Sequence, residues 1–122
     1  MRATIVLATL ALAACVEQKP VDGAALFAEN CASCHGADAK GDAEMAAALG
    51  KSIPDLTKIA ARNGGVFDHD AVMSTIDGLH RSDDNPMPEF GDGDLGEIIM
   101  VGSTPIPAEL FALANYLHSI QE

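Results

Sequence analysis

The sequence predicts a single all-α domain of three to five helices, and three observations support this prediction. The chain has 122 residues, which is the length of one ordinary domain. Its helical stretches begin at aspartates and end at glycines, and no convincing strand–helix–strand pattern interrupts them. Aromatic residues make up only 4% of a chain that is 48% hydrophobic. The core must therefore be aliphatic, or it must close around something that is not protein.

The charge of the chain excludes one large class of partners. Acids outnumber bases 18 to 7, for a net charge of -11, and a nucleic-acid binder needs a basic surface to neutralise phosphates. Six of the acids lie between Asp83 and Glu97, and no Lys or Arg follows Arg81. We expect this acidic segment to steer a partner that carries a basic patch. The alternative is that these acids serve solubility alone.

The N-terminal segment predicts an export signal. Arg2 is followed by the uncharged stretch Ala3–Ala14, which has the layout of a signal peptide and is too short for a transmembrane helix of about 20 residues. The ending Leu-Ala-Ala-Cys resembles a bacterial lipobox, which implies a lipid on Cys15; an ordinary signal peptide is the alternative. We expect a lipoprotein-type signal peptide over 1–14, a tether over 15–21 and the folded domain over 22–122.

One motif decides the chemistry of the domain. Cys31-Ala-Ser-Cys34-His35 is a C-x-x-C-H sequence, the attachment signature of c-type haem. Two cysteines three apart lie on one side of a helical turn, so both sulfurs can reach the vinyl groups at one porphyrin edge, and the next residue presents its imidazole to the iron. A redox dithiol would need a βαβ context, and a structural zinc site would need four ligands. We therefore predict thioether bonds at Cys31 and Cys34 and iron ligation by His35.

These residues give the chain a resemblance to the class I cytochromes c of bacteria over residues 22–120. The resemblance implies one covalently attached haem c surrounded by the helices, with attachment outside the cytoplasm. It also implies a first helix that leads into the C-x-x-C-H motif, a distal methionine on a loop, and a last helix that crosses the first.

The first half of the domain can be assigned element by element. Asp22 is a suitable N-cap for a helix up to Cys31, with Gly23 and Phe27 on one face. A short helix over 42–49 should end at Gly50, and a further helix is expected over 55–62. By the resemblance, the Pro54 carbonyl accepts a hydrogen bond from His35 Nδ1, and Leu56 packs on the haem.

The second half contains two more helices and one unassigned region. A helix over 69–77 should follow an N-cap at Asp68, with Phe67 as the staple residue, Met73 in its apolar stripe and Gly78 at its end. Residues 91–106 form a longer segment than the few loop residues expected before the last helix. Within it, 98–101 could be an extended segment. One hypothesis is that this region packs over the haem edge, and Met100 is expected to be a packing residue. A final helix should begin near Pro107 and run through Ile120. By the resemblance, Leu113 and Tyr116 meet Gly23 and Phe27, and Ala114 allows close approach.

The distal ligand is assigned to Met87. By the resemblance, the sequence Asn-Pro-Met87-Pro-Glu-Phe corresponds to the family's distal loop, and a thioether is a soft, neutral ligand that raises the reduction potential of a His-ligated haem. The flanking prolines restrict the backbone on both sides. His80 is the competing ligand in the same loop. His69 and His118 are expected to be ordinary surface or half-buried histidines.

An iron with two strong axial ligands leaves no open position for a substrate. The sequence therefore predicts an electron carrier, not an enzyme, that passes single electrons between redox proteins at the periplasmic face of a membrane, anchored by a lipid at Cys15. Two alternatives stay open: an electron-transfer subunit of a dehydrogenase or oxidase complex, and a haem-based ligand sensor in which Met87 is displaceable.

Overall fold

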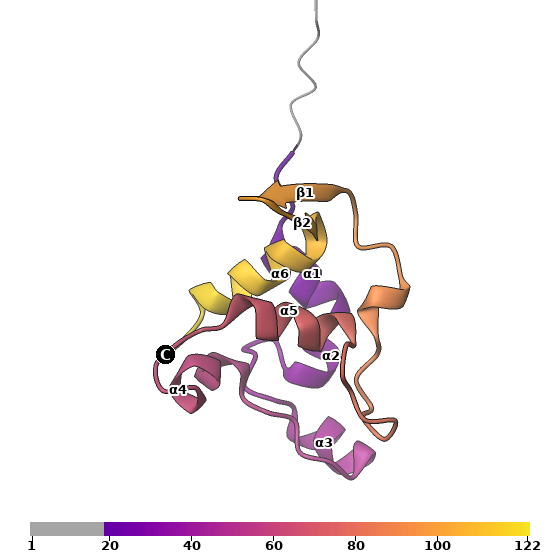
Figure 1. Ribbon diagram of the computed structural model, residues 1–122. Coiled ribbons are helices and arrows are strands. Elements are labelled where there is room, and N and C mark those ends of the chain that lie inside the picture. Colours follow the sequence, from indigo (N-terminus) through magenta and orange to yellow (C-terminus); the bar gives the residue numbers. More distant parts are fainter. Residues whose placement is uncertain (1–18) are drawn as a thin grey trace, which may run out of the picture.

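The computed structural model describes residues 19–122, and its elements follow the predicted order (Figure 1). The predicted signal peptide and the lipidation site at Cys15 lie outside the described residues. The helices and strands are α1 (Gly23–Asn30), α2 (Ala32–His35), α3 (Ala43–Leu49), the 3-10 turn η1 (Leu56–Lys58), α4 (Ile59–Arg62), α5 (His69–Asp77), the 3-10 turn η2 (Phe90–Asp92), β1 (Ile98–Val101), β2 (Thr104–Pro107) and α6 (Ala108–Ser119).

Helices α1 and α6 cross and pack against each other, as the sequence predicts (Figure 1). The Asp22 side chain accepts hydrogen bonds from the Ala24 and Ala25 backbone N–H groups, which fixes the start of α1. The rings of Phe27 and Tyr116 pack with centroids 5.3 Å apart. A Cβ on Gly23 would lie 2.1 Å from the Ala112 carbonyl oxygen. The helices therefore approach this closely only because Gly23 has no side chain.

Helix α5 also packs against α6 and has the predicted bounds. The Asp68 carboxylate accepts a hydrogen bond from the Ala71 N–H at its start, and Gly78 ends it with a left-handed backbone. Its buried stripe includes Met73, which is 7% exposed. Met73 is thus a core residue, as predicted. Phe67, before the cap, stacks on His118 with ring centroids 4.8 Å apart.

A β-hairpin, made of β1 and β2, adds to the predicted all-α fold. The two strands pair antiparallel and turn at Gly102, whose φ of +62° suits a two-residue loop. Carbonyls at the foot of the hairpin accept hydrogen bonds from the first N–H groups of α6, Glu97 from Ala108 and Leu95 from Glu109. Because these groups have no partner inside the helix, the hairpin region serves as the N-terminal cap of α6.

Two hypotheses about this region are wrong. None of residues 91–106 lines the cavities beside His35 described below. The hairpin lies at the opposite end of the domain, where Ile99 shares a depression with Lys19 and Asp22. Met100 does not pack in the core but is 63% exposed, because it lies on the outer face of the hairpin.

A tight loop after α2 brings residues 53–56 under the C-x-x-C-H motif. The Gly41 N–H donates to the His35 carbonyl at 2.7 Å, and the Leu56 N–H donates to the carbonyl of the fully buried Ala39 at 2.8 Å. A Cβ on Gly41, whose φ is +93°, would lie 2.8 Å from the Ile53 carbonyl oxygen. Glycine here lets the proline-containing segment approach the motif. Among the helices of residues 19–122, none is long and apolar enough to cross a membrane.

Candidate haem site

The C-x-x-C-H motif forms the short helix α2 directly after α1. Cys31, Cys34 and His35 are all half-buried, and the two cysteines are free thiols. The His35 N–H donates to the Cys31 carbonyl at 2.9 Å, which holds the motif in a single helical turn. Burial, and to a lesser degree the neighbouring Cys34, raises the pKa of the Cys31 thiol. The geometry therefore presents both sulfurs and the imidazole from one turn of helix.

His35 has a buried ring nitrogen with no hydrogen-bond partner among the described residues. That atom is Nδ1. Burial lowers the pKa of His35, and the Pro54 backbone acts in the opposite direction, so the Pro54 carbonyl faces the imidazole without meeting hydrogen-bond geometry. A neutral imidazole is the form that ligates iron. The hydrogen bond from His35 Nδ1 to Pro54 stays a prediction.

Two cavities of about 390 and 420 Å³ lie against the motif. Their walls share five residues from four parts of the chain: Cys31, His35, Pro54, Thr75 and Met87. The first extends over the apolar side chains of α1, α5 and α6, and Leu56 lines it as predicted. Cys34 and Lys51 line the second. The two volumes are neighbouring parts of one crevice, which His35 and Met87 both border.

The Met87 loop returns to this crevice from the end of α5. Met87 is half-buried and packs against the hydrophobic core. Its backbone N–H donates to the Asn85 side-chain oxygen at 3.0 Å. The loop also reaches across the second cavity, where the Lys51 ammonium group forms an ion pair with Asp84 at 2.8 Å. The sequence predicts Met87 as a ligand but does not predict the contacts that hold its loop.

The other candidate ligands lie away from the crevice. His80 is exposed, has a φ of +60° and lines neither cavity. His69 is half-buried and His118 is exposed, as predicted; their rings pack edge to face, with centroids 4.8 Å apart. Met45 is half-buried and lines neither cavity. Met87 is therefore the methionine that shares a cavity wall with His35.

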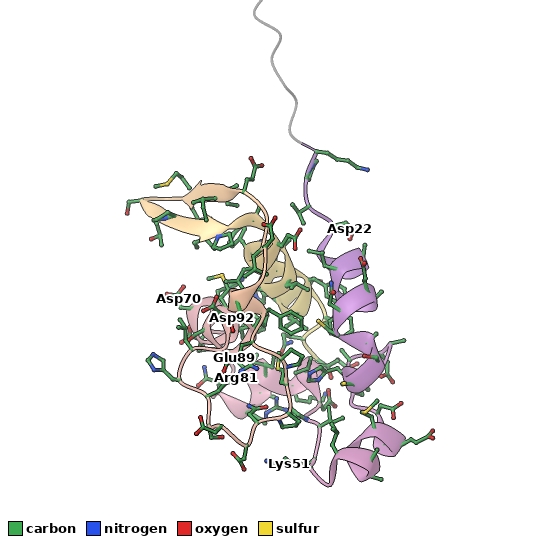
Figure 2. All side chains as sticks on the ribbon, turned by 90° about the vertical axis from the view of Figure 1, so that its right-hand side faces the viewer. Asp22, Lys51, Asp70, Arg81, Glu89 and Asp92 are labelled. Carbon is green, nitrogen blue, oxygen red and sulfur yellow. The ribbon has the colours of Figure 1, made fainter. Side chains whose placement is uncertain are left out.

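Arg81 makes contacts beside the crevice that the sequence did not reveal. It is half-buried, and its guanidinium group donates to backbone carbonyls of α5 and of the Met87 loop. Figure 2 shows Arg81 among the acidic side chains Glu89 and Asp92. A lone arginine before a long acidic run was the only signal in the sequence, and it does not say which atoms the side chain meets.

The residues present fit a haem. The crevice is walled mainly by apolar side chains, as a porphyrin requires, and its two cysteines lie where thioether bonds would form. When a neutral His35 ligates iron through Nε2, its ring proton is on Nδ1. The unpaired Nδ1 is then free to donate a hydrogen bond. His35 and Met87 supply the nitrogen and sulfur ligands that haem proteins use for electron transfer. Fold and site together define a small helical domain that holds one covalently bound haem.

Comparison with known proteins identifies the family. The family model for cytochrome c matches residues 20–121, and the chain therefore belongs to the cytochrome c family. This membership assigns it one covalently attached haem c and an electron-transfer function. A solved structure titled KustC0563 c-type cytochrome shares the fold, with a TM-score of 0.54 and 17% identity over 84% of this chain and 100% of that one.

The curated relatives are longer proteins. The chain is 36% identical over 109 residues to the Cbb3-type cytochrome c oxidase subunit CcoP of Rhodobacter capsulatus. The aligned region covers 85% of this chain and 30% of that protein. It is 45% identical over 56 residues to the subunit of the same name from Rubrivivax gelatinosus, covering 46% of this chain and 15% of that protein. The chain thus spans less than a third of these relatives.

Proposed function

We propose that Cys31 and Cys34 would bind the haem covalently and that His35 and Met87 would be the ligands of its iron. The observation that carries this proposal is that His35 and Met87 border the same two cavities, with Cys31 in the wall of both. Leu56 contributes an apolar contact to the same wall. Pro54, whose carbonyl faces the imidazole, would fix the ring through His35 Nδ1 once the site is filled.

Such a site would carry single electrons and perform no bond chemistry. A haem held there would supply one-electron redox chemistry. His35 from α2 and Met87 from a loop held by side-chain contacts would be its iron ligands, and both come from fixed elements. No cluster of three or more potential metal-ligating side chains occurs in residues 19–122.

The test is an absorption spectrum of the exported protein in both oxidation states. We expect low-spin haem c bands and, in the oxidised form, the weak band that arises from sulfur bound to iron. Met87→Ala should abolish that band. Met100→Ala, which truncates an exposed methionine on the hairpin, should keep it. A sulfur band that survives in Met87→Ala would overturn the ligand assignment, and a purified protein without haem would overturn the site.

The domain would work at a membrane surface. The apolar stretch Ala3–Ala14 followed by Cys15 supports export and a lipid anchor on that cysteine. Residues 1–14 would then be the signal peptide, 15–21 a short tether and 22–122 the cytochrome domain on the periplasmic side. Mass spectrometry of the mature N-terminal peptide tests this proposal, because acyl chains on Cys15 add a defined mass. A mature N-terminus without a lipid on Cys15 would contradict it.

A second function, as an electron-transfer subunit of an oxidase complex, is favoured by the relatives. Both curated relatives named above are subunits of a Cbb3-type cytochrome c oxidase. Co-purification of a large oxidase partner with the tagged protein would support this alternative. A chain that purifies alone from membranes, and reduces soluble partners, would support the mobile carrier.

A further inference from the structure

The side chain of Arg81 joins two elements that border the haem crevice. Its Nε donates to the Thr75 carbonyl at 3.0 Å, and one terminal nitrogen donates to Thr75 and, at 3.1 Å, to the Ile76 carbonyl. The other terminal nitrogen donates to the Met87 carbonyl and, at 2.7 Å, to that of Pro88. One guanidinium group therefore binds four carbonyls, two on α5 and two on the distal loop.

The α5 end offers these carbonyls because a helix leaves its last C=O groups without partners. The Ser74 carbonyl accepts from the Gly78 and Leu79 N–H groups, which leaves Thr75 and Ile76 for the side chain. A cation is also favoured at the negative end of a helix. Arg81 thus acts as the C-terminal cap of α5, and that cap fixes its guanidinium group beside the Met87 loop.

The Met87 loop has few backbone donors of its own. Pro86 and Pro88 have no N–H to donate, so Met87 carries the single backbone donor of this tripeptide. That donor binds the Asn85 side chain, and the Met87 carbonyl binds Arg81. Both backbone groups of Met87 are therefore held by side chains, and Arg81 supplies the hydrogen bonds that join this tripeptide to α5.

Within residues 19–122, Arg81 forms no ion pair, although it lies directly before the acidic segment. The ion pairs found there are Lys40–Glu122, Lys51–Asp84 and Lys58–Glu122. The forked, planar geometry of Arg81 matches two pairs of carbonyls, which a lysine ammonium group could not bind together. The contacts thus depend on the shape of the guanidinium group as well as on its charge.

From these contacts we infer that Arg81 is a positioning residue that holds the Met87 sulfur at the iron. The inference rests on the proposed ligation by Met87. Without Arg81, the loop would keep its sequence and its prolines but lose its bond to α5. The sulfur would then be displaced more easily by a small ligand that competes for the same iron position.

The test measures imidazole binding to the oxidised holoprotein together with the sulfur–iron band. Arg81→Gln should bind imidazole at least about tenfold more tightly than the wild type, which corresponds to about 1.4 kcal/mol, and its sulfur band should weaken. Arg81→Lys keeps the charge without the fork and should fall between the two. Lys58→Gln, which removes one positive charge away from the cavities, should bind imidazole as the wild type does.

The variants separate the possible failures. Wild-type imidazole affinity and an intact band in both Arg81 variants would overturn the positioning role and leave Met87 ligation intact. Equal shifts in Arg81→Gln and Lys58→Gln would assign the effect to charge and also overturn it. If Arg81→Gln yields no folded holoprotein, Arg81→Lys decides alone by the same criterion. A wild type without the sulfur band would overturn Met87 ligation and the positioning role together.

Discussion

At the scale of single residues, Gly23 determines how closely α1 approaches α6. A side chain at this position meets backbone, since even a Cβ would lie 2.1 Å from the Ala112 oxygen and 3.0 Å from the Tyr116 Cβ. Backbone can yield only by moving the helices apart. This would also disturb Phe27, which is 2% exposed and lines the first cavity.

We therefore expect Gly23→Leu to lower the free energy of unfolding by about 3 kcal/mol and to reduce the yield of holoprotein. Ala28→Leu is the matched control, because it places the same side chain on an exposed position of the same helix. Thermal unfolding followed by helical circular dichroism measures the difference. Equal melting of the two variants would show that the helices do not need this close approach.

The Lys51–Asp84 pair links the two loops that border the second cavity. The Lys51 ammonium group donates to the Asp84 carboxylate, and together with a hydrogen bond from Ser82 it lowers the pKa of Asp84 from 3.8 to about 2. A carboxyl group with a lowered folded-state pKa stabilises the fold above its unfolded pKa. That contribution is lost as the pH falls from about 4 through about 2.

Asp84→Asn should therefore be less stable than the wild type near neutral pH. The difference should shrink as the pH falls from about 4 and vanish only at about pH 2. Lys51→Gln, which removes the partner of Asp84, should remove the same pH dependence. The effect is small because both side chains are largely exposed, and added salt should reduce it further. Urea unfolding from about pH 6 down to about pH 2 measures it; a difference that is constant with pH would contradict the pair's role.

At the scale of elements, the end of α6 holds the segment that carries Leu56. The Gln121 side-chain oxygen accepts from the Ala60 N–H at 2.9 Å, and its nitrogen donates to the Leu56 and Leu117 carbonyls at 2.8 and 2.7 Å. One amide thus joins η1, α4 and α6. The floor of the first cavity depends on a residue far away in the sequence.

Gln121→Ala should lower the free energy of unfolding by about 1–3 kcal/mol, because it leaves half-buried backbone groups unpaired. Glu122→Gln is the control. The ion pairs of Glu122 with Lys40 and Lys58 are exposed, so their loss should change the free energy of unfolding little. Chemical denaturation of the two holoproteins compares them. The reverse order of stability would show that the C-terminal charges, not the amide, hold the segment.

Elements with local signals could be predicted from the sequence, and those fixed by distant contacts could not. The bounds of α5 follow from the Asp68 cap and the Gly78 stop, which act within a few residues. Strand β2 gave no such signal, because Pro105 and Pro107 argue against a strand. The hairpin has only two strands, so both are edges, and prolines are tolerated there.

The candidate site divides in the same way. The covalent motif and Met87 could be predicted because short sequence patterns carry them. The role of Arg81 could not, because its acceptors are backbone carbonyls, and these are identical at every residue type. Only the folded path of α5 and the distal loop brings the four carbonyls to one guanidinium group.

The hairpin and the loops beside the second cavity lie at opposite ends of the whole molecule. The hairpin and residues 19–22 lie at one end, and α3 with the loops that border the second cavity lies at the other (Figure 1). If the chain is anchored through Cys15, the haem crevice faces away from the anchor. The acidic side chains Asp83, Asp84 and Glu89 belong to that accessible end or to the loop beside it. A redox partner would meet this negative surface first.

The rate of electron exchange with a basic partner protein should therefore fall as ionic strength rises. Steering by opposite charges accelerates encounter about 10-fold to 1000-fold, and salt screens it over about 10 Å at 0.1 M. The chain has a net charge of -11, so the decline should reach at least about tenfold between low and physiological salt. A neutral small-molecule oxidant should show no such decline, and Asp83→Asn with Glu89→Gln should flatten the dependence for the protein partner alone. Stopped-flow mixing at a series of salt concentrations measures all three. A rate that is flat or rises with salt would leave the acids to solubility.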